Sequence, residues 1–187
     1  MKIRVKRFKK VKSTNDTALK LIKTNITNPM LVISEKQTGG RGRFGKKWVS
    51  KKGNLFVTIF FKLDQKKINF KQFAILNALL IKKLISKKIS SKVRIKWPND
   101  LLYKNNKFCG ILQELIQFNH FEFLIVGIGL NTNIAPQNKS FKSTCLKNII
   151  NKKISNEKIL KNILSAYEKL LNETQKLSFS ELKRKYK

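Results

Sequence analysis

Residues 93–130 read VRIKWPNDLLYKNNKFCGILQELIQFNHFEFLIVGIGL. Within them the runs VRIKW, LLY, KFCGILQEL and FEFLIVGIGL are apolar and rich in β-branched or aromatic residues, as is typical of strands. Only short polar segments separate the runs: a Pro-Asn-Asp turn, a turn expected at Asn105–Asn106, and a turn that contains His120. Connections this short join antiparallel neighbours, so the stretch predicts a series of hairpin-linked strands.

The rest of the chain adds strands before this series and helices on both sides of it. Strands are expected at 3–8, 31–34 and 54–62, and a long helix is expected at 70–87, where apolar residues recur at helical spacing. STND at 13–16 offers N-cap chemistry for a helix from Asp16 to Lys23. Past residue 135 strand signals stop, and helices are expected from Asn156, as its own cap, and from Ser180. The pattern predicts an α+β fold with a mixed, largely antiparallel sheet flanked by helices.

Length and composition favour one soluble domain. The 187 residues fit a single compact domain, 1–187, and no apolar run reaches the roughly 18 residues of a membrane span. The basic N-terminus lacks a following apolar stretch, so a cytoplasmic protein is expected. Two cysteines, Cys109 and Cys145, and one histidine leave little material for a disulfide framework, a zinc site or a histidine-based triad.

The charge balance is strongly basic. There are 42 Lys and Arg against 10 Asp and Glu, a formal net charge of +32. Such a balance suits a nucleic-acid partner. The lysines are nevertheless spread along nearly every segment together with Asn and Ile, so a solvated lysine-rich surface explains them as well. The charge alone leaves an RNA-binding protein open.

GGRGRFGKKW at 39–48 contains both GxGxxG and GxxxxGK, two patterns associated with phosphate binding. A dinucleotide fold needs a helix directly after the last glycine, but another glycine and strand residues follow here. A P-loop needs Ser or Thr after its lysine, and position 47 is lysine. Neither pattern therefore applies in its usual form, and a flexible basic surface loop remains the plain alternative.

Three further segments carry polar groups or glycines beside expected strands. KWPND at 96–100 ends a strand, and Lys107 starts the return strand that continues to Gly110. VGIGLNTN at 126–133 has two glycines that open space beside a strand, and STN at 13–15 groups hydrogen-bonding side chains at a helix start. Each alone has a structural explanation as a turn, a bulge or a cap.

In this order the segments resemble the catalytic domain of biotin protein ligases. The matching stretches are STN, QTGGRGRFGKKW, KWPNDLLYKNNKFCGILQEL and VGIGLNTN, within residues 13–133. The resemblance implies a fold like the class II aminoacyl-tRNA synthetase core. It implies that biotin and ATP, with Mg²⁺, form biotinyl-5'-AMP, which then acylates a lysine of the biotin carboxyl carrier protein of acetyl-CoA carboxylase.

The resemblance also implies roles for individual residues. Lys107 and Arg43 would be catalytic, and Asp100 would help to organise Mg²⁺ or its water shell. The expected biotin-binding residues are Ser13, Thr14, Asn15, Gln37, Gly40, Arg41, Gly42, Arg43, Lys107, Gly110, Ile111 and Leu112. The expected nucleotide-binding residues are Arg43, Lys46, Trp48 and Asn131, of which Trp48 would cover the adenine and Asn131 would read its edge.

The chain also departs from the family pattern. Phe44 and Lys46 occupy positions that are often arginine in relatives. An N-terminal helix-turn-helix and the C-terminal small β-barrel of many relatives are expected to be absent, so specific DNA binding is not expected, and the protein would be a monomer or a homodimer without membrane association. A lipoate or octanoate transferase on the same fold and a basic RNA-binding protein remain the alternatives.

Overall fold

A computed structural model describes residues 1–86, 89, 92–137 and 142–187. Its centre is a seven-stranded sheet in the order β1-β2-β3-β7-β6-β5-β4. The strands are β1 (Arg4–Phe8), β2 (Met30–Ser34), β3 (Leu55–Lys62), β4 (Val93–Lys96), β5 (Asp100–Tyr103), β6 (Asn106–Phe118) and β7 (Phe121–Leu130). β1 and β2 run parallel and every other neighbouring pair is antiparallel, which confirms the expected mixed, largely antiparallel sheet.

Two tight hairpins set the register of the strands from β5 to β7. Asn119 and His120 both have positive φ, and Phe118 pairs with Phe121 across them, so His120 lies in a turn as predicted. The other turn is centred on Lys104 and Asn105, one residue earlier than predicted. The prediction was wrong because two-residue turns of this hand need positive φ at both central residues, which leaves Asn106 as the first residue of β6.

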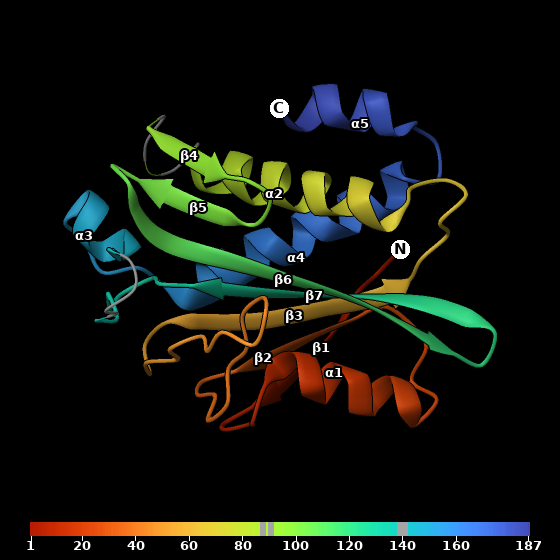
Figure 1. Ribbon diagram of the computed structural model, residues 1–187, viewed down its shortest axis with the longest axis horizontal. Coiled ribbons are helices and arrows are strands. Elements are labelled where there is room, and N and C mark those ends of the chain that lie inside the picture. Colours follow the sequence, from red (N-terminus) through yellow and green to blue (C-terminus); the bar gives the residue numbers. More distant parts are fainter. Residues whose placement is uncertain (87–88, 90–91, 138–141) are drawn as a thin grey trace.

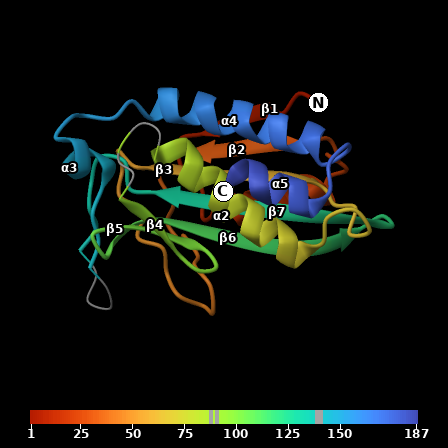
Figure 2. The ribbon, with the colours of Figure 1, turned by 90° about the horizontal axis from the view of Figure 1, so that it is seen from above.

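One face of the sheet is covered by the long helices α2 (Phe70–Ser86) and α4 (Asn156–Glu173), with α5 (Phe179–Tyr186) beside α2 (Figures 1 and 2). The main core lies between them and includes Leu76, Ile128 and Tyr167. Cys109 and Cys145 are buried free thiols, and burial raises the pKa of the Cys109 thiol, consistent with a structural role.

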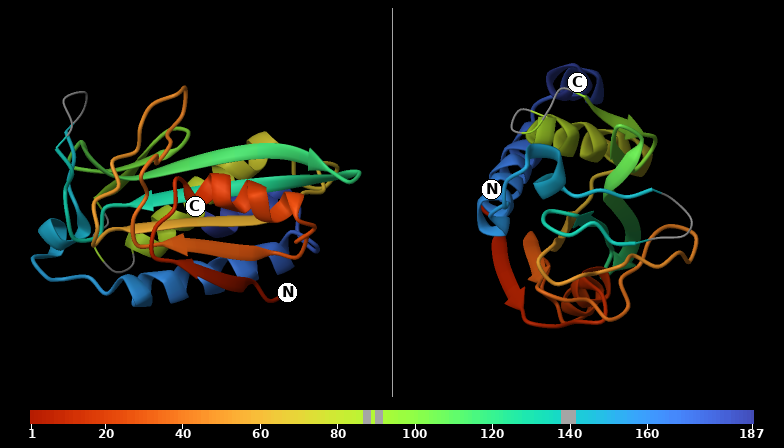
Figure 3. Two further views of the ribbon diagram at one scale, coloured as in Figure 1. Left: turned by 90° about the horizontal axis from the view of Figure 1, so that it is seen from below. Right: turned by 90° about the vertical axis from the view of Figure 1, so that its left-hand side faces the viewer.

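Helix α1 (Thr14–Lys23) covers part of the opposite face, where Ala18 and Ile22 pack against Val32 and Phe60 (Figure 1). STND supplies the N-cap as predicted, but the helix begins at Thr14, two residues before the predicted Asp16, because the capping residue is Ser13, whose side chain accepts a hydrogen bond from the Asp16 amide. The end of this face that α1 leaves uncovered carries the 35–54 connection (Figure 3).

The C-terminal helices begin close to the predicted places with different caps. Ser155, not Asn156, caps α4, and Ser178 forms a capping box with Glu181 at the start of α5. The short helix α3 (Leu146–Ile150) lies in the stretch where the sequence predicted no element. Within the part of the chain that the structure describes, no helix has the length and apolar character needed to cross a bilayer.

Candidate functional site

A cavity of about 680 Å³ lies on the α1 side of the sheet. It is bounded by the start of α1, the 41–49 loop, the β4–β5 turn, and the glycine-bearing parts of β6 and β7. The volume is that of a typical pocket for a small molecule or cofactor. Strand alternation makes Gly110, Leu112, Gly127 and Gly129 face this side, because Gly110 pairs with Gly129 and Leu112 with Gly127.

The 39–48 loop folds back on itself beside this cavity. The Gly42 amide donates to the Lys46 carbonyl over 2.6 Å, and the Trp48 amide donates to the Gly40 carbonyl over 2.9 Å. Phe44 and Gly45 have positive φ at the tip, where Phe44 is 87% exposed. The residues that follow lead into β3 and not into a helix, so the dinucleotide-type reading is excluded by the structure as it was by the sequence.

The Trp48 ring packs against two glycines of the sheet. A Cβ at Gly110 would come within 2.7 Å of the indole ring, and one at Gly129 within 2.4 Å. The indole Nε1 is buried and has no hydrogen-bond partner among the described residues. The two glycines therefore make room for the ring, which forms one wall of the cavity.

Lys107 and Asp100 form an ion pair on the floor of the cavity. The Lys107 Nζ lies 2.7 Å from the Asp100 carboxylate, and both side chains are only 18% exposed. Lys107 is also 5.4 Å from the centre of the Trp48 ring. The hairpin produces this arrangement: Leu102 pairs with Lys107, and a register shift between Leu101 and Leu102 brings Asp100 opposite Gly110.

Arg43 connects the loop to the β4–β5 turn. Its Nη1 donates to Asn99 Oδ1 over 3.0 Å, and its guanidinium lies over the Phe44 ring at 4.8 Å. Lys46 also lines the cavity. The loop thus adds Arg43 and Lys46 to a cavity lining that also includes Lys107 and Asp100.

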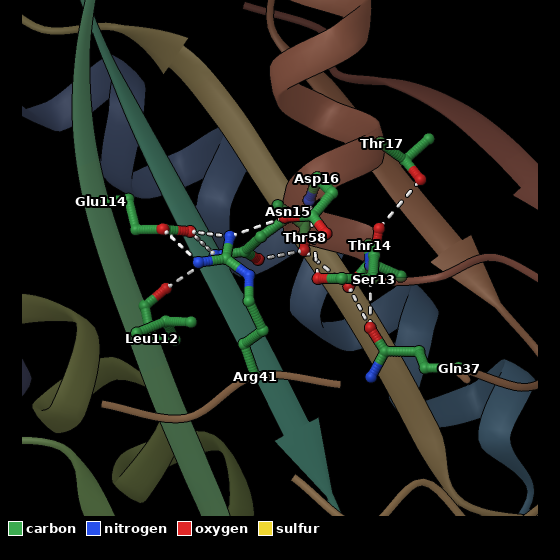
Figure 4. Close-up of polar contacts among 10 residues, drawn as sticks. All are labelled: Ser13, Thr14, Asn15, Asp16, Thr17, Gln37, Arg41, Thr58, Leu112 and Glu114. Carbon is green, nitrogen blue, oxygen red and sulfur yellow. Dashed lines mark hydrogen bonds and ion pairs between the residues drawn. The ribbon is translucent and has the colours of Figure 1, made fainter. Parts of the chain in front are cut away.

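A cluster of neutral polar side chains occupies the α1 end of the cavity (Figure 4). Gln37 Oε1 accepts from the Thr14 amide over 2.8 Å, and Thr58 lies 2.8 Å from Thr14 Oγ1 and 2.6 Å from Asn15 Oδ1. Ser13 lines the same end. The four predicted residues from STN and Gln37 are therefore brought together by the fold.

Arg41 lies between two carboxylates beside this cluster (Figure 4). Its guanidinium binds both oxygens of Glu114, over 2.8 and 2.9 Å, and lies 2.8 Å from Asp16. The hydrogen bond with Glu114 raises the pKa of Arg41. In this structure Arg41 is therefore engaged with protein carboxylates as well as lining the cavity.

Sequence reasoning missed Thr58, Asp16 and Glu114. Two signals were present: Thr58 is the one hydroxyl in the otherwise apolar run LFVTIFF, and Glu114 follows Leu112 by two positions, on the same face of the strand. The link between Glu114 and Arg41, 73 positions apart, has no sequence signal.

Three predicted residues lie differently from the rest. Gly40 is buried against Trp48, Ser50 and Gln37, and Asn131 is buried with its amide donating to the Thr144 carbonyl, so neither residue lines the cavity. Ile111 lines the cavity, but its side chain belongs to the core on the other face. The adenine-reading role of Asn131 stays a prediction.

Comparison with known proteins places this geometry in a family. Residues 7–131, about two thirds of the chain, match the model of the Biotin/lipoate A/B protein ligase family. The chain belongs to this family. The fold supports the assignment. The biotin protein ligase from Aquifex aeolicus, solved in complex with biotin and ATP, is similar to this chain with a TM-score of 0.81 at 29% identity, and the match covers 98% of this chain and 76% of that one.

Family members of known activity are also similar in sequence. The bifunctional ligase/repressor BirA of Bacillus subtilis is 30% identical over 177 residues, 91% of this chain and 54% of that protein. The biotin–[acetyl-CoA-carboxylase] ligase of Paracoccus denitrificans is 32% identical over 127 residues, 66% of this chain and 52% of that protein. The chain thus spans about half the length of these curated relatives.

Proposed function

We propose that the chain catalyses the ATP-dependent ligation of biotin to a lysine of a biotin carboxyl carrier domain through biotinyl-5'-AMP. One observation carries the proposal: a single cavity is lined both by the neutral polar cluster of Ser13, Thr14, Asn15 and Gln37 and by the cations Lys107, Arg43 and Lys46. Biotin has an uncharged ring and a carboxylate, and ATP is a nucleoside triphosphate. The ring needs neutral polar partners, and the carboxylate and the phosphates need cations close by. Relatives named as biotin ligases support the same assignment.

The polar cluster suits the ring of biotin. The ureido group is uncharged but has both N–H donors and a carbonyl acceptor, which match Ser13, Thr14, Asn15 and Gln37. Leu112 and the flat Trp48 ring offer apolar surface for the rest of the bicyclic ring system. A ring without these N–H and carbonyl groups would leave the buried polar side chains unpaired, so the site discriminates strongly against it.

The cationic end suits formation of the mixed anhydride. A carboxylate oxygen of biotin attacks the α-phosphorus, the bond from that phosphorus to the pyrophosphate oxygen breaks, and negative charge gathers where two anions meet. Lys107, with an ammonium group of low exposure, stabilises this charge, and Arg43 binds phosphate with planar donor geometry.

Asp100 fits a supporting role toward Mg²⁺. It is a carboxylate in the cavity beside Lys107, and magnesium that arrives with ATP commonly takes one or two protein carboxylates together with phosphate oxygens and water. Bound magnesium would offset charge on the phosphates. We propose Asp100 for this contact and Trp48 for covering the adenine. Asn131 is buried outside the cavity lining, so its proposed contact with the adenine edge requires its amide to leave the Thr144 carbonyl when the nucleotide binds.

In the second step the carrier lysine attacks the activated carbonyl. The new carbon–nitrogen bond replaces the bond from the carbonyl carbon to AMP, and the amine proton passes to solvent. For this step the protein needs only to keep the acyl-adenylate bound where the carrier lysine can reach it and to protect it from hydrolysis. We propose a carrier of the acetyl-CoA carboxylase type and a cytoplasmic ligase that acts as a monomer or homodimer.

The test is biotin-dependent exchange of radiolabelled pyrophosphate into ATP, followed by transfer to a purified carrier domain. Lys107→Ala should lower the exchange rate by about 10²- to 10³-fold, the usual cost of one charge-stabilising group. Lys104→Ala is the matched control, because Lys104 is exposed at the adjacent turn. No exchange by the wild-type protein, or equal exchange by Lys107→Ala, would contradict the proposal.

The same assay separates the alternatives. Pyrophosphate exchange that depends on lipoate or octanoate in place of biotin would identify the other branch of the family, whose name includes both biotin and lipoate. Binding of mixed RNA, without pyrophosphate exchange in the presence of biotin, lipoate or octanoate, would favour an RNA-binding protein.

A further inference from the structure

Glu114 fixes the orientation of the Asn15 amide. Its Oε2 accepts from Asn15 Nδ2 over 2.6 Å, while both of its oxygens accept from Arg41 (Figure 4). A carboxylate paired with a guanidinium offers only acceptors, so the amide must turn its NH₂ group toward Glu114. Asn15 also lies against Gly127, where a Cβ would come within 2.2 Å of Oδ1, so the side chain has little room to swing away.

This orientation determines the direction of the next hydrogen bonds. Asn15 Oδ1 then faces Thr58 Oγ1 at 2.6 Å and must accept its single proton. Thr58 is fully buried, so no bulk water intervenes, and the same hydroxyl makes a second, longer contact of 2.8 Å with Thr14 Oγ1. The Thr14 hydroxyl donates its own proton to Gln37 Oε1 over 3.1 Å, and Gln37 Oε1 also accepts from the Thr14 amide.

The cluster is thereby left with free acceptors and few free donors. The NH₂ group of Asn15 is directed to Glu114 and to the Leu112 carbonyl, and the protons of Thr14 and Thr58 are used within the cluster. Lone pairs remain on Asn15 Oδ1 and Thr14 Oγ1, both on residues that line the cavity. A ligand that donates hydrogen bonds completes this arrangement, and one without N–H groups leaves it unsatisfied.

We propose that Glu114 is a positioning residue that makes the cavity selective for a neutral ring bearing N–H donors. It acts through Asn15, with Arg41 holding its carboxylate in place. The inference rests on the proposed function and deepens it: the ureido ring of biotin carries two N–H groups, whereas the ring of lipoate and the chain of octanoate carry none.

The experiment compares Glu114→Gln with Asp16→Asn. Both substitutions remove one carboxylate from Arg41, but only Glu114 also contacts Asn15. Calorimetry is run with biotin, with dethiobiotin, which keeps the ureido ring, and with ATP. Glu114→Gln should weaken the binding of biotin and of dethiobiotin by the same factor, about 10- to 100-fold. Its affinity for ATP should stay within about twofold of the wild-type value. Asp16→Asn should weaken the binding of biotin by less than about threefold.

A second variant tests the route through Asn15. Thr58→Val removes the hydroxyl that Asn15 accepts from, so Glu114→Gln should add little further loss in the Thr58→Val background. Independent, multiplying losses in the double variant would overturn the inference. Equal losses in Asp16→Asn and Glu114→Gln, or an equal loss of ATP binding, would overturn it too.

The ligand-free protein separates this inference from the proposed function. The side-chain amide resonances of Asn15 should shift in Glu114→Gln and stay in place in Asp16→Asn. Unchanged resonances in Glu114→Gln would defeat the inference whether or not biotin binds. A wild-type protein that binds no biotin would defeat the proposed function, and with it the assigned selectivity.

Discussion

At the scale of single residues, Gly129 shows how the absence of a side chain shapes the cavity. Gly129→Ala would place a Cβ within 2.4 Å of the Trp48 ring, on a strand paired on both sides, so the indole must move. We expect the free energy of unfolding in urea to fall by about 1–3 kcal/mol and biotin binding to weaken. Gly39→Ala is the control, because its Cβ meets the flexible Lys12 side chain at 3.1 Å. A variant as stable as wild type, with unchanged Trp fluorescence, would contradict this account.

Much of the candidate site could be predicted at this scale. Ser13, Arg43, Lys107 and most of the other predicted residues line one cavity. The resemblance supplied them, because it rests on short ordered segments such as KWPND that carry these residues. Glu114 could not be found in this way, since its role depends on its contacts with Arg41 and Asn15, which only the folded chain creates.

At the scale of elements, the 39–48 loop is joined to the rest of the chain mainly through side chains. After the Gly39 amide, which donates to the Lys12 carbonyl, its backbone hydrogen bonds are internal, and Arg41, Arg43, Lys46 and Lys47 offer trypsin several cleavage sites on it. We expect biotin and ATP together to slow cleavage in this loop by about tenfold or more, because a ligand that binds only the ordered loop lowers its open population. Cleavage at Lys152, between α3 and α4, serves as the internal control. Equal protection at both places, or none at the loop, would refute the expectation.

The attachment of α5 should depend on pH. Burial opposes ionisation of Glu173, but hydrogen bonds from Lys185 and Tyr186 outweigh it, so the pKa of this carboxyl is lowered from its ordinary 4.5. A lowered pKa contributes stability that is present above about pH 4.5 and is lost as the pH falls below it. Glu173→Gln should cost about 1 kcal/mol at pH 7 and flatten the acid limb of the stability curve, measured by urea unfolding from pH 7 to pH 3. An unaltered acid limb would contradict this.

The elements themselves were largely predictable, and their ends were not. The strands of 93–130 and the long helix α2 follow from apolar periodicity, which is local in the chain. The turn at Lys104 and the cap at Ser155 each lie one position from the predicted residue. Such ends depend on backbone dihedral angles and single hydrogen bonds, which periodicity does not report.

At the scale of the whole molecule, charge is the dominant feature. Five of the ten acidic residues take part in ion pairs among the described residues, and most lysines are left on the surface. Binding to mixed RNA, if measured, should therefore fall by about 10³-fold between 50 and 200 mM salt. Biotin-dependent pyrophosphate exchange should change far less, because Lys107 and Asp100 lie together in a cavity of low exposure. Exchange that collapses in parallel with RNA binding would link the two activities and contradict this separation.

By itself the sequence determined the order of strands and helices, the mixed sheet and the set of short segments that mark the family. It could do so because periodicity and motifs are properties of neighbours along the chain. Only the tertiary structure decided that Trp48 lies on two glycines, that Arg41 is held by Glu114 and Asp16, and that Asn131 is buried beside the cavity. Those facts join residues as far apart as Trp48 and Gly129, and a contact between distant residues exists only once the sheet has brought its strands together.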